Sequence, residues 1–111
     1  MTYSNQAKED LVKVSHDTLL AHGAVSEETV REMAFGASKL FGSSVSVAVS
    51  GIAGPGGATP EKPVGLVYIG VSDGSRCIVS KNDFKGDRRE VRESTVNEAL
   101  LMVEEFIEGI L

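Results

Sequence analysis

Apolar residues recur at helical spacing at both ends of the chain, and short apolar runs occupy its middle. The first periodic stretch predicts a helix from Asn5 to about Val14, with Ser4 as its N-cap. A short turn follows and ends at Gly23. The next helix is expected to begin after Ser26, a good N-cap, and to end at Gly42. Its inward stripe has helical spacing and consists of Val30, Met33, Ala34, Ala37 and Phe41.

The middle of the chain predicts three strands: Val45 to Ser50, Leu66 to Ser72, and Arg76 to Lys81. The last two are joined by Asp73-Gly74-Ser75, whose Asp-Gly pair favours a hairpin. The first strand lacks a clean alternation of polar and apolar residues, because Ser46 and Ala48 are both small. This pattern is typical of a central strand that is covered on both faces.

A long final helix is predicted to start at Asp87, where Glu90 three residues later completes an approximate capping box. Its inward stripe would be Val91, Thr95, Ala99, Met102, Val103, Phe106 and Ile110. Helices before and after a set of strands favour an α/β fold, with helices on both sides of a mixed sheet. We predict a single domain over residues 1–111.

Composition narrows the possible functions. The formal net charge of −5 argues against a protein that binds duplex nucleic acid, which usually has a basic face. The single cysteine, Cys77, excludes an internal disulfide and a cysteine-based zinc site, and an inert buried thiol is expected. His16 and His22 have no partner pattern for a metal. With no apolar stretch long enough to cross a bilayer, and no secretory signal, we expect a cytoplasmic protein.

The stretch from Ser50 to Gly65 reads SGIAGPGGATPEKPVG and contains five glycines and three prolines. Glycine permits a close backbone approach to a ligand, whereas proline limits flexibility, so the combination suits a ligand-binding loop. The spacing matches neither a P-loop, nor G-x-G-x-x-G, nor the Gly-x-Ser-x-Gly elbow. An ordinary surface loop between strands explains the composition equally well.

Three further places have both a functional and a structural interpretation. Ser50 ends a strand, where ligands often bind in open α/β sheets, but its hydroxyl also suits a bond to nearby backbone. Lys8 lies in the first turn of a helix, and on its own it is better interpreted as a solvated side chain. Arg88 and Arg89 follow a helix start, a place that favours phosphate or simply carries surface arginines.

Taken together, these segments resemble the C-terminal domain of the CinA family, the nicotinamide-nucleotide amidohydrolases also called PncC. The resemblance covers essentially the whole chain in the right order. It is carried by Thr2-Tyr-Ser-Asn-Gln-Ala-Lys8, Leu20-Ala-His-Gly-Ala-Val-Ser-Glu27, Ser50-Gly-Ile-Ala-Gly-Pro-Gly-Gly57 with Pro60-Glu-Lys-Pro-Val-Gly65, and Phe84-Lys-Gly-Asp-Arg88 followed by Arg92.

The resemblance implies a three-layer α/β/α sandwich and a reaction. The family hydrolyses the carboxamide of nicotinamide mononucleotide to give nicotinate mononucleotide and ammonia, and it is also associated with natural competence. Lys8 would be the general base, with Tyr3 beside it. Arg88 and Arg92 would face the phosphate of the nucleotide. The substrate-binding wall would be formed by Ser50, Gly51, Gly54, Gly56 and Gly57. No metal or other cofactor is implied, and the partners expected are a pyridine mononucleotide and a second copy of the chain.

One departure from the family pattern affects the expected activity. The family's nucleophilic serine lies in a Glu-Ser-x-Thr-Gly-Gly segment, which the 111 residues do not contain. The chain is then either a truncated sequence, a shortened paralogue that binds without catalysis, or an enzyme in which Ser50 replaces the nucleophile. A non-catalytic nucleotide-binding or assembly module is therefore the alternative function. A domain with a missing strand is also expected to dimerise through its open sheet edge.

Overall fold

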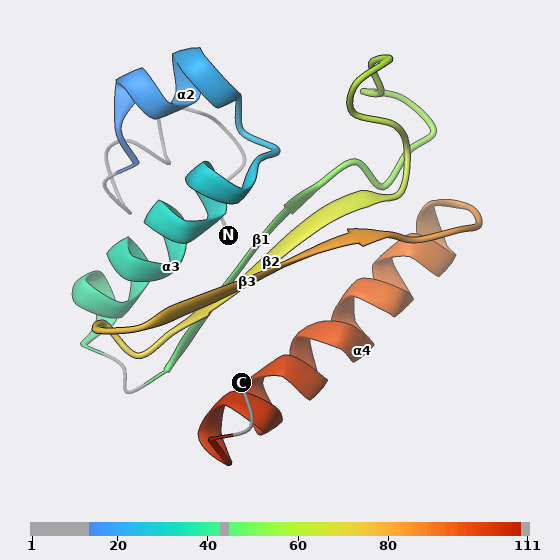
Figure 1. The fold of residues 1–111 in the computed structure, drawn as a ribbon. Coiled ribbons are helices and arrows are strands. Elements are labelled where there is room, and N and C mark those ends of the chain that lie inside the picture. The colour runs from blue at the N-terminus through green and yellow to red at the C-terminus, as the bar shows by residue number, and fades with distance from the viewer. Residues whose placement is uncertain (1–13, 43–44, 110–111) are drawn as a thin grey trace.

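The computed structural model describes residues 14–42 and 45–109. Three strands form one antiparallel sheet in the order β1-β2-β3, and the long helix α4 follows them (Figure 1). The helix expected from Asn5 to Val14 lies outside the described residues except for Val14 itself. The elements run in the order α2 (His16–His22), α3 (Glu27–Phe41), β1 (Ser46–Gly51), β2 (Leu66–Ser72), β3 (Cys77–Asp83) and α4 (Arg88–Ile107).

The sheet separates α2 and α3 on one side from α4 on the other, so the expected α/β/α layers are confirmed (Figure 1). Both strand pairs within residues 14–42 and 45–109 are antiparallel, and the parallel pair that a mixed sheet requires is not among them. The described part of the chain contains no helix that is both long and apolar enough to cross a membrane.

Helix α3 starts and ends where the sequence predicts. The Ser26 hydroxyl accepts a hydrogen bond from the Thr29 N–H at 3.2 Å, and it donates to the Gly23 carbonyl at 3.0 Å. Gly42 ends the helix with left-handed backbone geometry. These bonds satisfy backbone groups that the first and last turns of a helix leave open.

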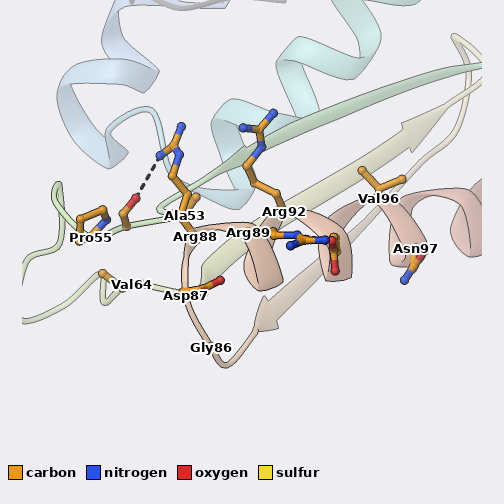
Figure 2. Close-up of a pocket in the computed structure, with 12 residues that line it drawn as sticks. Ala53, Pro55, Val64, Gly86, Asp87, Arg88, Arg89, Arg92, Val96 and Asn97 are labelled. Atoms are coloured by element: carbon orange, nitrogen blue, oxygen red, sulfur yellow. Dashed lines mark hydrogen bonds and ion pairs between the residues drawn. The ribbon is translucent and has the colours of Figure 1, made fainter.

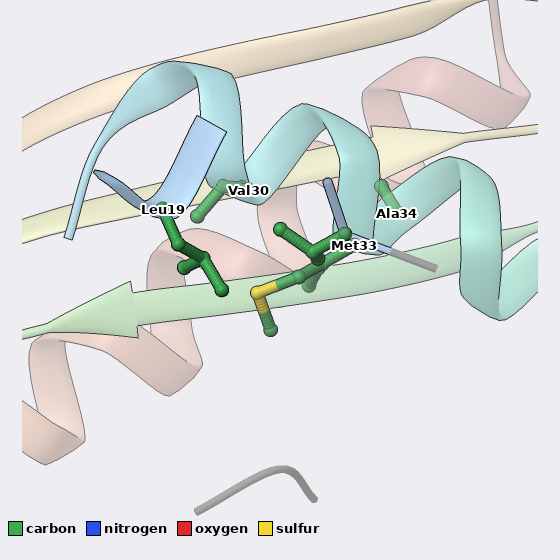
Figure 3. Packing of buried hydrophobic residues seen from close by; sticks show 6 residues of the cluster. Leu19, Val30, Met33 and Ala34 are labelled. Carbon is green, nitrogen blue, oxygen red and sulfur yellow. The ribbon is translucent and has the colours of Figure 1, made fainter. Parts of the chain in front are cut away.

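On the α3 face, small residues let the helix approach the sheet closely. Val30 and Ala34 are fully buried, and Met33 lies beside them over β1 (Figure 3). A Cβ added to Gly70 of β2 would lie only 2.8 Å from the Val30 Cγ1 atom. Ala48 of β1 joins the same cluster. Because Gly70 and Ala48 lack bulky side chains, α3 can pack closely against the sheet.

On the α4 face, larger side chains fill the space between sheet and helix. The β2 residues Val67, Ile69 and Val71 are buried against Val91, Met102 and Phe106 of α4. The predicted stripe of α4 is therefore confirmed at its core, with Ala99 and Val103 partly buried beside it. Ile110 lies outside the described residues.

The prediction that β1 is a central strand is wrong for the described sheet, because β2 lies at its centre and β1 at its edge. Ser46 and Ala48 are buried toward α3, while Val47 and Val49 are 45% and 40% exposed on the opposite face. The serine and alanine are small because α3 packs closely on them, while on the other face residues 14–42 and 45–109 leave Val47 and Val49 partly exposed. Small residues on one face of a strand thus do not indicate cover on both.

The β2–β3 hairpin forms as predicted, and Ser72 pairs with Cys77 across it. The Asp73 carboxylate accepts hydrogen bonds from the backbone N–H groups of Arg76 at 2.8 Å and Ser75 at 2.9 Å. These bonds lower the pKa of Asp73. Cys77 is half-buried, and its burial raises the pKa of its thiol, which agrees with an unreactive side chain.

Candidate functional site

A cavity of about 1220 Å³ lies between the glycine-rich loop and the first turns of α4 (Figure 2). The loop is the connection between β1 and β2, and α4 begins just after β3, so chain segments distant in sequence meet here. The cavity is lined by Ala53, Gly54, Pro55 and Val64 from the loop, and by Gly86, Asp87, Arg88, Arg89, Arg92, Glu93, Val96 and Asn97 from the start of α4.

The start of α4 is fixed by the predicted capping box. The Asp87 carboxylate accepts from the Glu90 N–H at 2.9 Å, and the Asp87 N–H donates to the Glu90 carboxylate at 3.1 Å. Arg89 reaches along the helix and donates to Glu93 at 3.0 Å. The positive charge of Arg89 is thus paired with the carboxylate of Glu93 in the same helix.

Arg88 and Arg92 lie one helical turn apart and extend from the same side of α4 (Figure 2). Arg88 donates from Nη1 to the Gly54 carbonyl at 3.1 Å, which joins the helix to the loop. Arg92 has no hydrogen-bond or ion-pair partner among residues 14–42 and 45–109, although it lines the cavity. The site therefore presents one guanidinium that holds the loop and one that is available to an anion.

The loop keeps its shape through a hydrogen-bonded neck. Ile52 donates to the Leu66 carbonyl at 2.9 Å, and Gly65 donates to the Ile52 carbonyl at 2.7 Å. Gly65 has a φ of 96°, and a Cβ there would lie 2.0 Å from the Phe84 carbonyl oxygen. Gly54 has a φ of 85°, and a Cβ there would lie 2.7 Å from the Val64 Cγ1 atom. Only glycine fits at these two positions, so the cavity wall depends on them.

Lys62 ties the far side of the loop to α2. Its ammonium donates to the His22 carbonyl at 2.5 Å, and its backbone forms a closed turn with Thr59. The carbonyl that accepts lies at the end of α2, where cations are stabilised by the helix dipole. The loop is therefore held from α4 by Arg88 and from α2 by Lys62.

The residues predicted as a substrate-binding wall do not all reach the cavity. Ser50 donates its hydroxyl to the Ala24 carbonyl at 2.8 Å, the structural role that the sequence left open. Gly51 lines a smaller cavity of about 300 Å³ beside Val49 and Val96. Gly56 and Gly57 are exposed near the tip of the loop. Of the predicted glycines, Gly54 alone lines the large cavity.

Tyr3 and Lys8, the predicted catalytic residues, lie outside the described residues, and their roles stay predictions. In the described part of the chain, no three His, Cys, Asp or Glu side chains gather to hold a metal ion.

The apolar wall of the cavity was missed by reasoning from sequence. Val96 follows Arg92 by one helical turn, so helical spacing alone places it on the same flank. Val64 and Ala53 reach the cavity only because the neck of the loop brings its two ends together. No sequence pattern predicts that Lys62 binds the end of α2, because Lys62 and His22 are 40 residues apart in the sequence.

The family model of the CinA C-terminal domain matches residues 1–107. A CinA-like protein of Endomicrobium trichonymphae is 51% identical over 90% of this chain, and one of Citrifermentans bemidjiense is 48% identical over 90%. The chain spans 23% and 24% of the length of these two relatives.

Solved structures give the same result for the fold. The competence damage-inducible protein A of Klebsiella pneumoniae has a TM-score of 0.91 at 34% identity, covering 96% of this chain and 66% of that one. The competence/damage inducible protein CihA of Agrobacterium tumefaciens has a TM-score of 0.88 at 41% identity, covering 92% and 63%. The family match and the shared fold both extend across the glycine-rich loop and the start of α4, and the chain belongs to the CinA C-terminal domain family.

Proposed function

We propose that the cavity between the glycine-rich loop and α4 binds nicotinamide mononucleotide, as part of a nicotinamide-nucleotide amidohydrolase. The observation that carries this proposal is the pair of arginines on one flank of α4, opposite an apolar loop. A mononucleotide combines one phosphate with a flat aromatic ring. The arginines on one side of the cavity suit the phosphate, and the apolar residues on the other side suit the ring.

The phosphate would be bound by Arg92. Its guanidinium lines the cavity without a partner in the described residues, near the positive end of the α4 dipole. A guanidinium binds phosphate through two parallel hydrogen bonds, which suits a site with a single free arginine. Arg88 would contribute charge while its bond to the Gly54 carbonyl holds the loop in place.

The pyridine ring would lie against the apolar side of the cavity. Ala53, Pro55 and Val64 supply that side from the loop, and Val96 supplies it from α4. Small-molecule sites are mostly apolar, with a few polar groups that fix the orientation of the ligand. The arrangement favours a ligand with a single phosphate and one flat ring over a polyanion.

The reaction would be hydrolysis of the carboxamide by water, giving the carboxylate and ammonia. By family resemblance, Lys8 would take a proton as general base, with Tyr3 beside it. The serine nucleophile of the family lies in a segment that the 111-residue sequence does not contain. Binding and hydrolysis are therefore tested separately, and a binding module without catalysis is the second candidate function.

Calorimetric titration of nicotinamide mononucleotide into the purified chain tests binding. We expect Arg92→Ala to weaken the binding of the nucleotide at least about tenfold, since a hydrogen bond to a charged group contributes about 1.5–3 kcal/mol. Arg89→Ala is the matched control, because it removes the same charge from an arginine already paired with Glu93. Nicotinamide riboside, which lacks the phosphate, should not distinguish Arg92→Ala from the wild type. Equal losses from the two arginine variants would contradict a specific phosphate site.

Ammonia release tests hydrolysis. The domain extended by the family's Glu-Ser-x-Thr-Gly-Gly segment should release ammonia from the mononucleotide, and replacing Lys8 by alanine should abolish the release. Binding by the 111-residue chain with no release from the extended domain would favour the binding module. No binding by either form would contradict both candidate functions.

A further inference from the structure

Both ends of the glycine-rich loop are bonded to one short turn between α2 and α3. We call this turn, residues His22–Ala24, the anchor turn. The Ser50 hydroxyl, where β1 runs into the loop, donates to the Ala24 carbonyl at 2.8 Å. The Lys62 ammonium, near the other end of the loop, donates to the His22 carbonyl at 2.5 Å. Side chains from opposite ends of the loop therefore bind carbonyls that almost adjoin each other.

The anchor turn is itself fixed to the start of α3. The Gly23 carbonyl accepts hydrogen bonds from the Ser26 hydroxyl at 3.0 Å and from the Thr29 hydroxyl at 2.6 Å. Thr29 is fully buried, and the Gly23 N–H donates to the Leu19 carbonyl at 2.9 Å. All three carbonyls of the turn thus accept from side chains, and the closely packed α3 layer holds the turn in place.

The place that Lys62 occupies on the anchor turn suits an ammonium group. The His22 carbonyl lies at the end of α2, where a positive charge is stabilised by the helix dipole. Gly23 beside it has no side chain, and a Cβ there would lie only 3.0 Å from the Lys62 Nζ atom. The turn therefore provides both an acceptor for the lysine and the space that its ammonium needs.

Lys62 does not line the large cavity, but residues that follow it do. Its backbone closes a turn with Thr59, and Val64 shortly after it forms part of the cavity wall. Val64 lies so close to Gly54 that a Cβ on Gly54 would be 2.7 Å from the Val64 Cγ1 atom. A displacement of Lys62 would therefore be passed on to Val64 and Gly54, which belong to the loop side of the cavity.

We propose that Lys62 is a positioning residue of the cavity, which acts by holding the loop on the anchor turn. The expected change in ligand affinity rests on the proposed function, because the ligand is nicotinamide mononucleotide. Without the ammonium, Ser50 and the neck still hold the base of the loop, but the segment before Val64 adopts more conformations. Ordering this segment then opposes binding, so the affinity falls although no contact with the ligand is lost.

Lys62→Met tests the proposal, because it keeps an unbranched side chain of similar length and removes the donor. In the ligand-free chain, hydrogen exchange at the loop amides of Thr59 and Gly65 should become about threefold to tenfold faster. Calorimetric titration should show nicotinamide mononucleotide bound at least about threefold more weakly. Lys39→Met is the matched control, because it removes an exposed lysine from the last turn of α3 and should change neither quantity.

Two further variants separate positioning from a general loss of structure. Lys62→Arg keeps a charged donor, so it should restore slow exchange and wild-type affinity. Ser50→Ala removes the other bond between loop and anchor turn. Combined with Lys62→Met, it should speed exchange by more than the product of the two single effects, because either bond alone keeps the loop near the turn. Far-UV circular dichroism verifies that each variant is folded.

Unchanged exchange in Lys62→Met would overturn the proposal, and so would a failure of Lys62→Arg to restore it. Faster exchange with undiminished affinity would show that holding the loop does not position the cavity, with the same consequence. Single effects that simply multiply would overturn the shared role of the anchor turn. If the wild-type chain binds no mononucleotide, the proposed function fails, whereas the exchange rates still decide whether Lys62 holds the loop.

Discussion

The two faces of the sheet are built by opposite means. Toward α3, Ala48 and Gly70 at the middle of β1 and β2 let the helix lie close over fully buried residues such as Val30, with larger side chains only partly buried beside them. Toward α4, the strands carry valine and isoleucine, and the helix covers the middle of the sheet but not β1. The large cavity and the smaller cavity beside Val49 both lie on the α4 side. The closely packed face therefore provides the scaffold, and the partly covered face provides the surfaces that are free to bind.

The largest effect is expected from truncating a buried side chain on the α3 face. Met33→Ala should lower the free energy of unfolding by about 2–5 kcal/mol, because it leaves a space among buried neighbours. Leu101→Ala on the exposed flank of α4 should change it by less than about 0.5 kcal/mol. Urea denaturation of both variants measures the difference. A similar loss from the two would contradict the contrast between the faces.

A second test compares two glycines. Gly70→Ala puts a methyl group 2.8 Å from the Val30 Cγ1 atom and should cost about 1–3 kcal/mol through overpacking. Gly56→Ala in the loop meets nothing within 4 Å and should leave stability unchanged or slightly raised. Thermal unfolding of the pair gives the answer, and a stable Gly70→Ala variant would show that α3 can move away from the sheet.

Loss of the hydrogen bond between Arg88 and the Gly54 carbonyl should change the free energy of global unfolding only slightly, but it should make local opening of the loop easier. Arg88→Ala removes the bond to the Gly54 carbonyl, but the side chain is exposed, so less than about 1 kcal/mol of unfolding free energy should be lost. Hydrogen exchange of residues 52–65 should nevertheless become faster. Arg89→Ala, which leaves the loop contact in place, should not alter it. Unchanged exchange in Arg88→Ala would show that the neck alone holds the loop.

The smallest effect concerns the hairpin, at the end of the sheet remote from the cavity. The backbone N–H groups of Arg76 and Ser75 hold the pKa of Asp73 below its ordinary value of 3.8. A depressed pKa stabilises the folded state above 3.8, and this contribution is lost as the pH falls from 3.8 toward the lower folded-state pKa. Asp73→Asn removes it, so the stability difference between wild type and variant should shrink as the pH falls below 3.8. A constant difference would contradict this account.

Local signals predicted much of the fold. Ser26 and Gly42 marked the ends of α3 because capping is a property of neighbouring residues, and Leu66–Ser72 was predicted with its observed bounds. The position of β1 was wrong, because a strand pattern records which side chains are small and not what covers them. Of the residues that line the large cavity, the sequence predicted Gly54, Arg88 and Arg92 as site residues. Its apolar wall depends on contacts between Ile52 and Gly65 that sequence spacing does not reveal.

The narrow neck of the glycine-rich loop has a consequence for protein engineering. Ile52, Gly65 and Leu66 close the loop with backbone hydrogen bonds, while its tip at Gly56 and Gly57 is exposed and does not line the large cavity. Exposed loop tips accept inserted sequence when the backbone bonds at their base stay intact. A fluorescent reporter domain inserted between Gly56 and Gly57 would thus leave the sheet undisturbed, yet lie next to the large cavity. Such a fusion would give an optical test of the proposed binding of nicotinamide mononucleotide.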